Sequence, residues 1–431
     1  MSERNRELLG LIPASLLVTG GFAAVFIQEQ DRLSDLSLTY GAIFLGLCVV
    51  AHVFLRLTLP HADPYLFPLV ALLACFGLVM VYRIDEDLAR DQAQWFVAGL
   101  IAFAATILVL RRDYRVLERY RYTIAAVSLL LLVLPRFPGI GAQVNGAYLG
   151  VKLGPISFQP AELAKIGIVI FLASYLRDYR QVMVVGGRRF LGLTIPPMRT
   201  LGPLLLVWAA AMLLLVFIRD LGSSLMFFGG FLALLYVATN RISFVAIGLA
   251  LFGAGAVFVA NTVGHVQDRI TTWLDPFQPG VVDKEGYQIA QALFAQADGG
   301  VLGVGFGQAL LELPGGAKIL PAAETDLIYA VITDELGLAG ACALILVYLL
   351  FTERGFKTAL LARDSFSTLL ATGLTAVFAL QVFVIVGGVT RVIPLTGVTL
   401  PFVSYGGSSI VANFILLALL LLVSNRARSP A

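Results

Sequence analysis

Carboxylates are concentrated in one stretch of a chain that otherwise carries few charges. The segment "WLDPFQPGVVDKEGYQIAQALFAQADGG", residues 273–300, contains Asp275, Asp283, Glu285 and Asp298, although 59% of the 431 residues are hydrophobic and only 13% are charged. A carboxylate within hydrogen-bond reach of a hydroxyl can remove its proton as a general base. This acidic stretch is therefore the first candidate for chemistry.

Two further pairs of charged residues adjoin apolar segments, where ionisable groups are costly and usually mark function. Glu162 and Lys165 are three residues apart in "FQPAELAK", so a helix places them on one side. An ion pair that only anchors the helix end is the alternative. Glu324 and Asp326 open the segment "ETDLIYAVITDELG", where carboxylates can also serve as helix caps.

Small and polar residues gather near the C-terminus. The segment "LTGVTLPFVSYGGSS", residues 395–409, contains Ser404 and Ser408 among closely spaced glycines and a proline. Such a composition in a membrane protein predicts either close helix packing or broken backbone that lines a cavity.

Several other kinds of site do not fit the sequence. His52, His61 and His265 are isolated, and no HxxxH or CxxC spacing exists, so no metal ligands are assigned. No GxSxG nucleophile motif occurs, and "GVLGVGFGQ" does not open a βαβ unit. The net charge of +3 is spread over many short connections and indicates no nucleic-acid partner.

The elements that must position these residues are membrane helices. The mean hydropathy is +0.89, and a bilayer crossing needs about 20 apolar residues. Apolar stretches of suitable length predict an all-α polytopic membrane protein with about twelve transmembrane helices, at residues 8–28, 38–58, 64–82, 93–110, 121–136, 158–176, 202–218, 222–239, 243–263, 326–351, 366–389 and 397–423.

The distribution of Lys and Arg predicts the orientation. With the N-terminus inside, the inner connections hold nineteen basic residues and the short outer connections hold seven, and cytoplasmic loops are the basic ones. Both termini are therefore expected in the cytoplasm. The long connection 264–325 is then extracellular, carries a net charge of −4, and contains at "GYQIAQALFAQADGG" a predicted amphipathic helix on the outer surface.

Four ordered motifs resemble those of the RodA/FtsW family, also called the SEDS family. They are "FQPAELAK", "WLDPF…D…GYQ", "ETDLIYAVITDELG" and "GVTLPFVSYGGSS", and the resemblance runs from about residue 64 to the end. It implies a ten-helix peptidoglycan glycosyltransferase that polymerises lipid II outside the cell membrane. Residues 1–63 would add two N-terminal helices to a core at 64–425, and residues 426–431 would form a cytoplasmic tail.

The resemblance also implies roles for individual residues. The catalytic aspartate of the family lies shortly before "GYQ", and the longer segment "QPGVV" here makes Asp283 the better match and Asp275 the fallback. An acceptor sugar hydroxyl would attack the donor anomeric carbon, with Asp283 as base, while undecaprenyl pyrophosphate leaves and Lys165 or Arg219 stabilises its charge. The expected substrate-binding residues are Glu162, Lys165, Arg219, Asp220, Tyr287, Gln288, Glu324, Asp326, Ser404 and Ser408.

The expected partners follow from the same resemblance. They are a class B penicillin-binding protein, bound through transmembrane helices, and other elongation or division proteins, with lipid II as substrate. No resident cofactor is assigned, and a divalent cation such as Mg²⁺ stays open. The two added helices favour an actinobacterial, elongation-type member, although division and sporulation roles also stay open.

Two other functions compete with the glycosyltransferase. The first is a lipid II flippase or another transporter of lipid-linked substrates, which would be expected to place polar sites near the bilayer midplane. The second is a scaffold that recruits wall enzymes, for which an acidic loop has no use. The polar residues cluster at predicted outer helix ends, which favours chemistry at the outer surface.

The predicted orientation can be tested by labelling. Cysteines introduced at Gly280 and at Gly187 should react oppositely with a membrane-impermeant thiol reagent, with Gly280 labelled from outside, because the charge distribution places them on opposite faces. Labelling of both positions from one side of intact cells would contradict the orientation.

Overall fold

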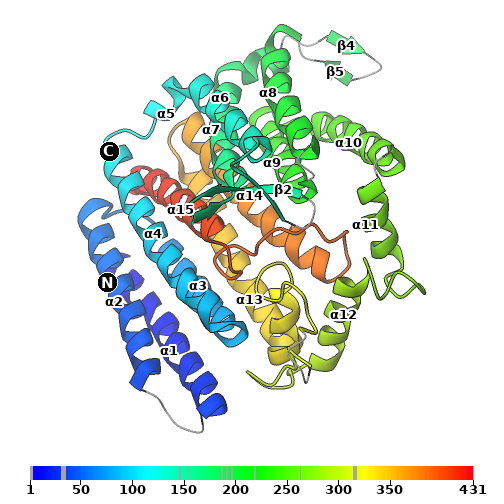
Figure 1. The fold of residues 1–431 in the computed structure, drawn as a ribbon. Coiled ribbons are helices and arrows are strands. Elements are labelled where there is room, and N and C mark those ends of the chain that lie inside the picture. The colour runs from blue at the N-terminus through cyan, green and yellow to red at the C-terminus, as the bar shows by residue number, and fades with distance from the viewer. Residues whose placement is uncertain are drawn as a thin grey trace.

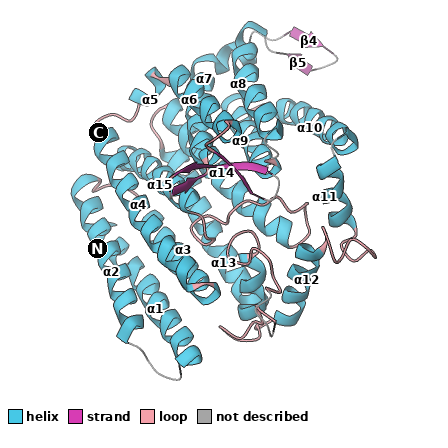
Figure 2. Ribbon diagram, in the orientation of Figure 1, coloured by secondary structure: helices cyan, strands magenta, loops and turns pink. Residues whose placement is uncertain are grey.

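The chain folds into a bundle of helices with two small antiparallel sheets (Figures 1 and 2). The structure, a computed structural model, describes residues 3–30, 35–144, 147–154, 156–185, 188–190, 193–195, 198–217, 220–262, 264–313 and 318–430. The predicted all-α polytopic class is confirmed, because helices dominate and nine of them, within the described residues, are long and apolar enough to cross a membrane.

A helix overlaps each of the twelve predicted apolar ranges. These helices are α1 (Glu3–Gln30), α2 (Asp35–Thr58), α3 (Leu66–Ile84), α4 (Glu86–Leu110), α6 (Arg121–Val133), α7 (Pro160–Val185), α8 (Met198–Phe217), α9 (Leu221–Thr239), α10 (Ile242–Thr262), α13 (Ile328–Leu361), α14 (Ser365–Val389) and α15 (Gly407–Arg428). Twelve crossings remain a prediction, since α6, α7 and α8 are not among the nine helices that satisfy both length and composition. The last helix begins ten residues later than expected, at Gly407.

The remaining elements lie in the connections. They are α5 (Val116–Arg119), the 3-10 turn η1 (Leu134–Arg136), α11 (Gly264–Leu274), α12 (Tyr287–Gly299), a sheet of β1 (Gly141–Val144), β2 (Ala147–Leu153) and β3 (Ile156–Phe158), and a hairpin of β4 (Arg188–Phe190) and β5 (Leu193–Ile195). The sequence analysis did not predict any strand. Both sheets are antiparallel between sequential strands, so short local pairing suffices to form them.

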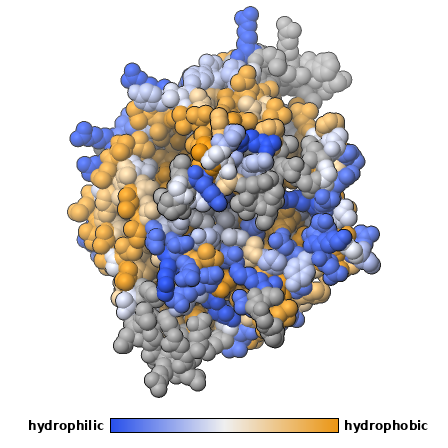
Figure 3. Space-filling model, in the orientation of Figure 1, coloured by the Kyte–Doolittle hydropathy of each residue, from blue (hydrophilic) through white to orange (hydrophobic). Residues whose placement is uncertain are grey.

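Two helices form the centre of the bundle. Most of α14 and α15 is buried, whereas α10 lies at the edge with few buried side chains. α15 packs along α4, and α14 packs against α13, α9 and α7. Figure 3 shows hydrophobic surface on the side of α2 and α4 and hydrophilic surface toward α11 and the segment before α12, as expected for a bundle with an apolar belt and a polar loop region.

The two N-terminal helices are attached to the core by buried polar contacts. α1 packs against α2 and α3. Glu7 is fully buried and pairs with Arg4 and with His52, whose Nδ1 lies 2.7 Å from the carboxylate. Arg4 also donates to the carbonyl of Ala62, in the turn before α3. These helices are therefore an integral part of the bundle.

Both ends of the chain lie on one face of the bundle, here called the terminal face. The start of α1 contacts the turn between α2 and α3 through Arg4. The end of α15 reaches the same turn, where Arg428 pairs with the buried Asp63. The helices α3, α13 and α15 therefore run between the terminal face and the opposite face.

The predicted helix in "GYQIAQALFAQADGG" is present as α12, but it does not lie free on the surface. It packs against α13, and Ile289, Ala290 and Ala292 are buried. Its apolar face is covered by protein because packing against α13 removes these side chains from water.

The buried cluster at Glu7 yields a stability prediction. Glu7→Ala leaves the Arg4 guanidinium without its buried carboxylate, and breaking such a pair costs about 3–5 kcal/mol, so the melting temperature of the purified protein should fall by several degrees. The matched control is Glu86→Ala, which removes an exposed pair with Arg90 worth about 0–1 kcal/mol. Equal losses in the two variants would contradict a role for α1 in holding the bundle.

Candidate functional site

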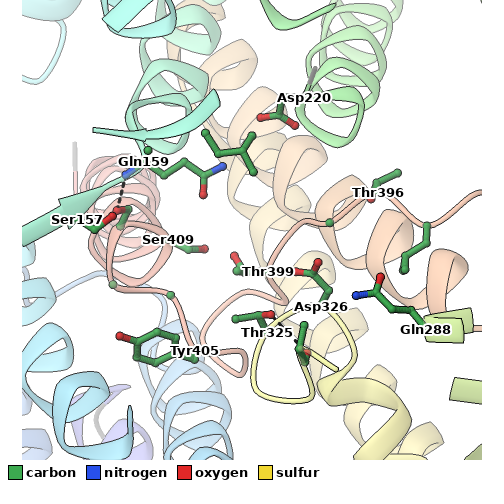
Figure 4. Close-up of a pocket in the computed structure, with 18 of the residues that line it drawn as sticks. Ser157, Gln159, Asp220, Gln288, Thr325, Asp326, Thr396, Thr399, Tyr405 and Ser409 are labelled. Carbon is green, nitrogen blue, oxygen red and sulfur yellow. Dashed lines mark hydrogen bonds between the residues drawn. The ribbon is translucent and has the colours of Figure 1, made fainter. Parts of the chain in front are cut away.

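A cavity of about 690 Å³ opens at the face opposite the termini. Seven parts of the chain meet around it: α4 at Trp95, the β2–β3 hairpin, the start of α9, α11, the start of α12, the segment before α13, and the α14–α15 loop, residues 390–406, with the first turn of α15. We call this side of the bundle the cavity face. Figure 4 shows side chains from the β2–β3 hairpin, the starts of α9 and α12, the segment before α13 and the α14–α15 loop around one space.

The cavity is acidic. Among the described residues that line it, four are carboxylates, Asp220, Asp268, Glu285 and Asp326, and Arg269 is the cationic one. Arg269 is fixed in place because its guanidinium donates to the carbonyl of Leu395 at 3.0 Å. Burial lowers the pKa of the Arg269 guanidinium. The nearby carboxylates of Asp220 and Asp326 oppose this effect because they favour its charged form.

Asp326 is one of the predicted residues that reaches the cavity. Figure 4 shows its carboxyl facing the side-chain amide of Gln288, another predicted residue. Burial raises the pKa of the Asp326 carboxyl from 3.8 to about 6, although the Arg269 guanidinium and the Thr325 hydroxyl lower it. The capping alternative is wrong for this helix start, because α13 has Leu327 at its N-cap and no side-chain cap.

Asp220 lies on the opposite wall, at the N-cap of α9. One carboxylate oxygen accepts from the backbone N–H of Ser223 at 2.9 Å. The other oxygen is buried and has no hydrogen-bond partner among the described residues. A buried acceptor without a partner costs free energy, so this oxygen is suited to a hydroxyl or amide donor from a ligand.

The α14–α15 loop forms the floor of the cavity, as broken backbone rather than helix. Ser404 does not face the cavity as a ligand group. Its hydroxyl donates to the carbonyl of Thr325 at 2.7 Å and accepts from the N–H of Leu400 at 2.9 Å. Ser408 lines the cavity and accepts from the N–H of Gln159 at 2.7 Å. The two serines therefore connect the floor by hydrogen bonds to the segment before α13 and to the residue after β3.

Two glycines allow the close approach of this floor to its neighbours. Gly397 has a φ of +73°, and a Cβ there would lie 3.3 Å from the Asp326 carboxylate. A Cβ at Gly407 would lie 2.1 Å from the ring of Trp95. A side chain at Gly407 would therefore displace the start of α15 from the cavity wall.

Glu162 and Lys165 form the expected pair beneath the cavity. The Lys165 Nζ lies 2.6 Å from the Glu162 carboxylate and 2.6 Å from Oε1 of Gln381, and both charged residues are buried. Gln381 in turn donates to the carbonyl of Thr399 at 2.9 Å. The pair is more than a surface anchor, because it supports the cavity floor, but neither residue lines the cavity.

The remaining predicted residues lie elsewhere. Asp283 and Asp275 are exposed in the segment between α11 and α12, outside the cavity lining, although Glu285 two residues after Asp283 does line it. Tyr287 begins α12 and is partly buried. The Glu324 carboxylate lies 3.5 Å from the Lys318 Nζ, and the backbone carbonyl of Glu324 accepts from the N–H of Tyr405. Arg219 lies outside the described residues.

Sequence analysis missed three residues that shape the site. Arg269 is the cation of the cavity, Gln381 joins the buried pair to the floor, and Gln92 bonds both sides of the floor, at Ser404 and Gly406. Gln381 could have been found, because it is a lone amide in the apolar stretch "LTAVFALQVFVIVGG". Gln92 lies in the charged start of α4 and carries no such signal.

A divalent cation finds no evident site. In the described part of the chain, no group of three or more His, Cys, Asp and Glu side chains is arranged to hold a metal ion. The carboxylates of the cavity instead flank one guanidinium. The arrangement can accept hydroxyl protons, bind hydroxyl groups, and place one positive charge beside an anion.

The fold and the site define a multi-pass helical membrane protein with an acidic cavity at one face of the bundle. Residues 64–429 match the profile of the FtsW, RodA and SpoVE cell cycle proteins, and the chain belongs to this family.

Relatives match beyond this core. The peptidoglycan glycosyltransferase RodA of Mycobacterium tuberculosis is 42% identical over 444 aligned residues, which cover 100% of this chain and 92% of that protein. The stage V sporulation protein E of Bacillus subtilis is 31% identical over 85% of this chain and 98% of that protein. The mycobacterial alignment therefore includes α1 and α2, which precede the family profile.

Solved structures share the fold. A chain from a peptidoglycan synthase complex that coordinates polymerization and crosslinking superposes with a TM-score of 0.67 at 27% identity, over 86% of this chain and 99% of that one. The Rod shape determining protein RodA of Thermus thermophilus superposes with a TM-score of 0.60 at 27% identity, over 86% of this chain and 98% of that one.

The raised pKa of Asp326 predicts a pH effect on stability. The folded state binds the proton of the Asp326 carboxyl more tightly than an unfolded chain does. The stability that this proton contributes is therefore complete below about pH 4 and is lost as the pH rises through about 6. Asp326→Asn stays neutral throughout. We therefore expect its melting temperature, relative to the parent, to increase between pH 4 and pH 8.

Arg269→Gln provides the matched comparison. Loss of the neighbouring positive charge should raise the pKa of Asp326 further and move the pH window upward. A difference between Asp326→Asn and the parent that is constant across the pH range would show that Asp326 does not titrate there.

Proposed function

We propose that this protein is a peptidoglycan glycosyltransferase that polymerises lipid II at the cavity face. The observation that carries the proposal is the 42% identity, over the full chain, to relatives with that activity in their names. The acidic cavity at the helix ends supports it, because a lipid-linked sugar presents its head group at that level of a membrane.

The proposed reaction joins two lipid-linked disaccharides. The acceptor hydroxyl loses its proton to a carboxylate and attacks the donor anomeric carbon, while the bond to undecaprenyl pyrophosphate breaks and the pyrophosphate leaves with the bonding electrons. Asp283 is the proposed base. It is exposed, without an ion-pair partner among the described residues, and its segment continues directly into Glu285 at the cavity.

Arg269 is the residue we assign to the leaving pyrophosphate. It lines the cavity, whereas Lys165 is already bound to Glu162 and Gln381 and does not reach the surface. A positive charge close to developing negative charge in a site shielded from water stabilises the transition state. Asp326 and Asp220 would then hold sugar hydroxyl groups on either side of the guanidinium.

The proposed setting is the outer face of the cell membrane, with both termini in the cytoplasm. The common position of the termini on one face, opposite the cavity, is consistent with that orientation. A class B penicillin-binding protein is the proposed partner, through its membrane helix. The likeness to a chain of a complex that coordinates polymerization with crosslinking supports this partner.

A flippase has less support. A transporter for the same lipid would need polar groups along a path through the bundle. The described cavity is instead lined mainly by helix ends and connections. Beneath it, the buried Glu162, Lys165 and Gln381 side chains bond one another, and the rest of the core around α14 and α15 is mainly apolar.

The proposed base can be tested with lipid II and the purified protein, with and without its partner. A general base contributes about 10²–10⁴-fold to rate, so Asp283→Asn should lower glycan polymerisation by that factor without changing the melting temperature. Asp275→Asn is the matched control on the same exposed segment and should retain activity.

Each other outcome has a distinct meaning. Loss of activity in Asp275→Asn alone would move the base eight residues toward α11. Loss in Glu285→Gln alone would assign the base to the carboxylate that lines the cavity. Full polymerase activity in all three variants would refute a base in this segment.

A further inference from the structure

A second charged pocket lies on the terminal face. It has a volume of about 350 Å³ and is formed by the turn after α4, the start of the α2–α3 turn and the end of α15. Its charged lining residues are Arg111, Arg112, Asp113, Arg115 and Arg426. Four guanidinium groups against one carboxylate give the described lining a strong positive potential.

The single carboxylate of the pocket, Asp113, already forms ion pairs with two of the arginines. Asp113 lies 3.4 Å from the Arg115 guanidinium and 3.2 Å from that of Arg426. Arg111 and Arg112 have no ion-pair partner among the described residues and are exposed. The pocket therefore offers two guanidinium groups that internal pairs do not neutralise.

One wall of the pocket is held by buried hydrogen bonds. Tyr114 is buried, and its hydroxyl lies 2.6 Å from the hydroxyl of Ser367, which donates to the Asp364 carboxylate at 2.7 Å. The Arg426 guanidinium lies over the Tyr114 ring, 5.7 Å from its centre. The Tyr114 ring and the Asp113 carboxylate therefore hold Arg426 at the pocket.

The position of the pocket relative to the membrane follows from α15. This helix starts at the cavity and ends at Arg428, and its 22 residues span about 33 Å. The hydrocarbon core of a bilayer is about 30 Å thick, so the pocket lies at head-group level of the leaflet opposite the cavity.

Apolar side chains lie next to the basic groups. Val109 in the last turn of α4 is 77% exposed and Leu57 at the end of α2 is 79% exposed, and Leu59 lines the pocket itself. A ligand with a phosphate and acyl chains could contact both the guanidinium groups and this apolar surface. A soluble anion would use only the guanidinium groups.

We propose that this pocket binds the phosphate head group of an anionic phospholipid from the leaflet at the terminal face. Guanidinium groups match phosphate oxygens in charge and geometry, and basic pockets between membrane helices suit such head groups. Bound lipid would bridge the α4–α5 turn and the end of α15, two parts that also position Trp95 and Ser408 at the cavity.

The alternative is that these arginines only set membrane orientation, as basic residues do on cytoplasmic loops. The two explanations differ in whether the function depends on particular arginines or on the total charge of the face. An orientation signal depends on the number of basic residues on a face, whereas a binding pocket depends on which arginines are present.

The test uses the purified full chain titrated with phosphatidylglycerol and followed by native mass spectrometry. Each cation near an anionic lipid contributes roughly fivefold to affinity, so Arg111→Gln/Arg112→Gln should bind about 25-fold more weakly. The matched control is Arg119→Gln/Arg241→Gln, which removes two exposed charges near the same face but outside the pocket and should change affinity less than twofold. Both variants change exposed side chains, and an unchanged melting temperature will verify folding.

Three results would overturn the proposal. The first is equal weakening in the two double variants, which would indicate a general charge effect. The second is binding of phosphatidylcholine as tight as that of phosphatidylglycerol, which would exclude recognition of negative charge. The third is displacement of the lipid by an equal concentration of glycerol phosphate, which would assign the pocket to a soluble phosphate instead.

Discussion

The site depends on one constraint: residues 400–404 of the α14–α15 loop are irregular backbone buried among helices, where water cannot satisfy their polar groups. Side chains from other elements do so. Gln92 bonds the backbone at Ser404 and Gly406, Gln381 bonds Thr399, and the buried Tyr348 donates to Pro401. Because these partners come from α4, α14 and α13, the cavity floor is fixed only when the whole bundle is assembled.

The buried Glu162–Lys165 pair has to be understood through this floor. Burying two charges costs free energy that their attraction offsets only with good geometry and further hydrogen bonds. Here the third partner is Gln381, which also holds the loop at Thr399. The pair therefore connects the start of α7 to the cavity floor without lining the cavity itself.

Charge is distributed differently on the two faces of the bundle. The cavity face gathers carboxylates around Arg269. The terminal face gathers arginines around Asp113. α15 runs from one face to the other and contributes residues to both pockets.

The sequence by itself determined the helical membrane class, the positions of the apolar helices, the local pairing of Glu162 with Lys165, and the family, because each depends on periodicity, composition or motifs within short segments. Only the tertiary structure decided that Asp220, Arg269 and Asp326 share one cavity while Asp283 stays on an exposed turn. It also revealed the small sheets, Gln381 and Gln92. These features arise from contacts between residues far apart in the chain, and local patterns carry no record of which distant partners will satisfy a buried polar group.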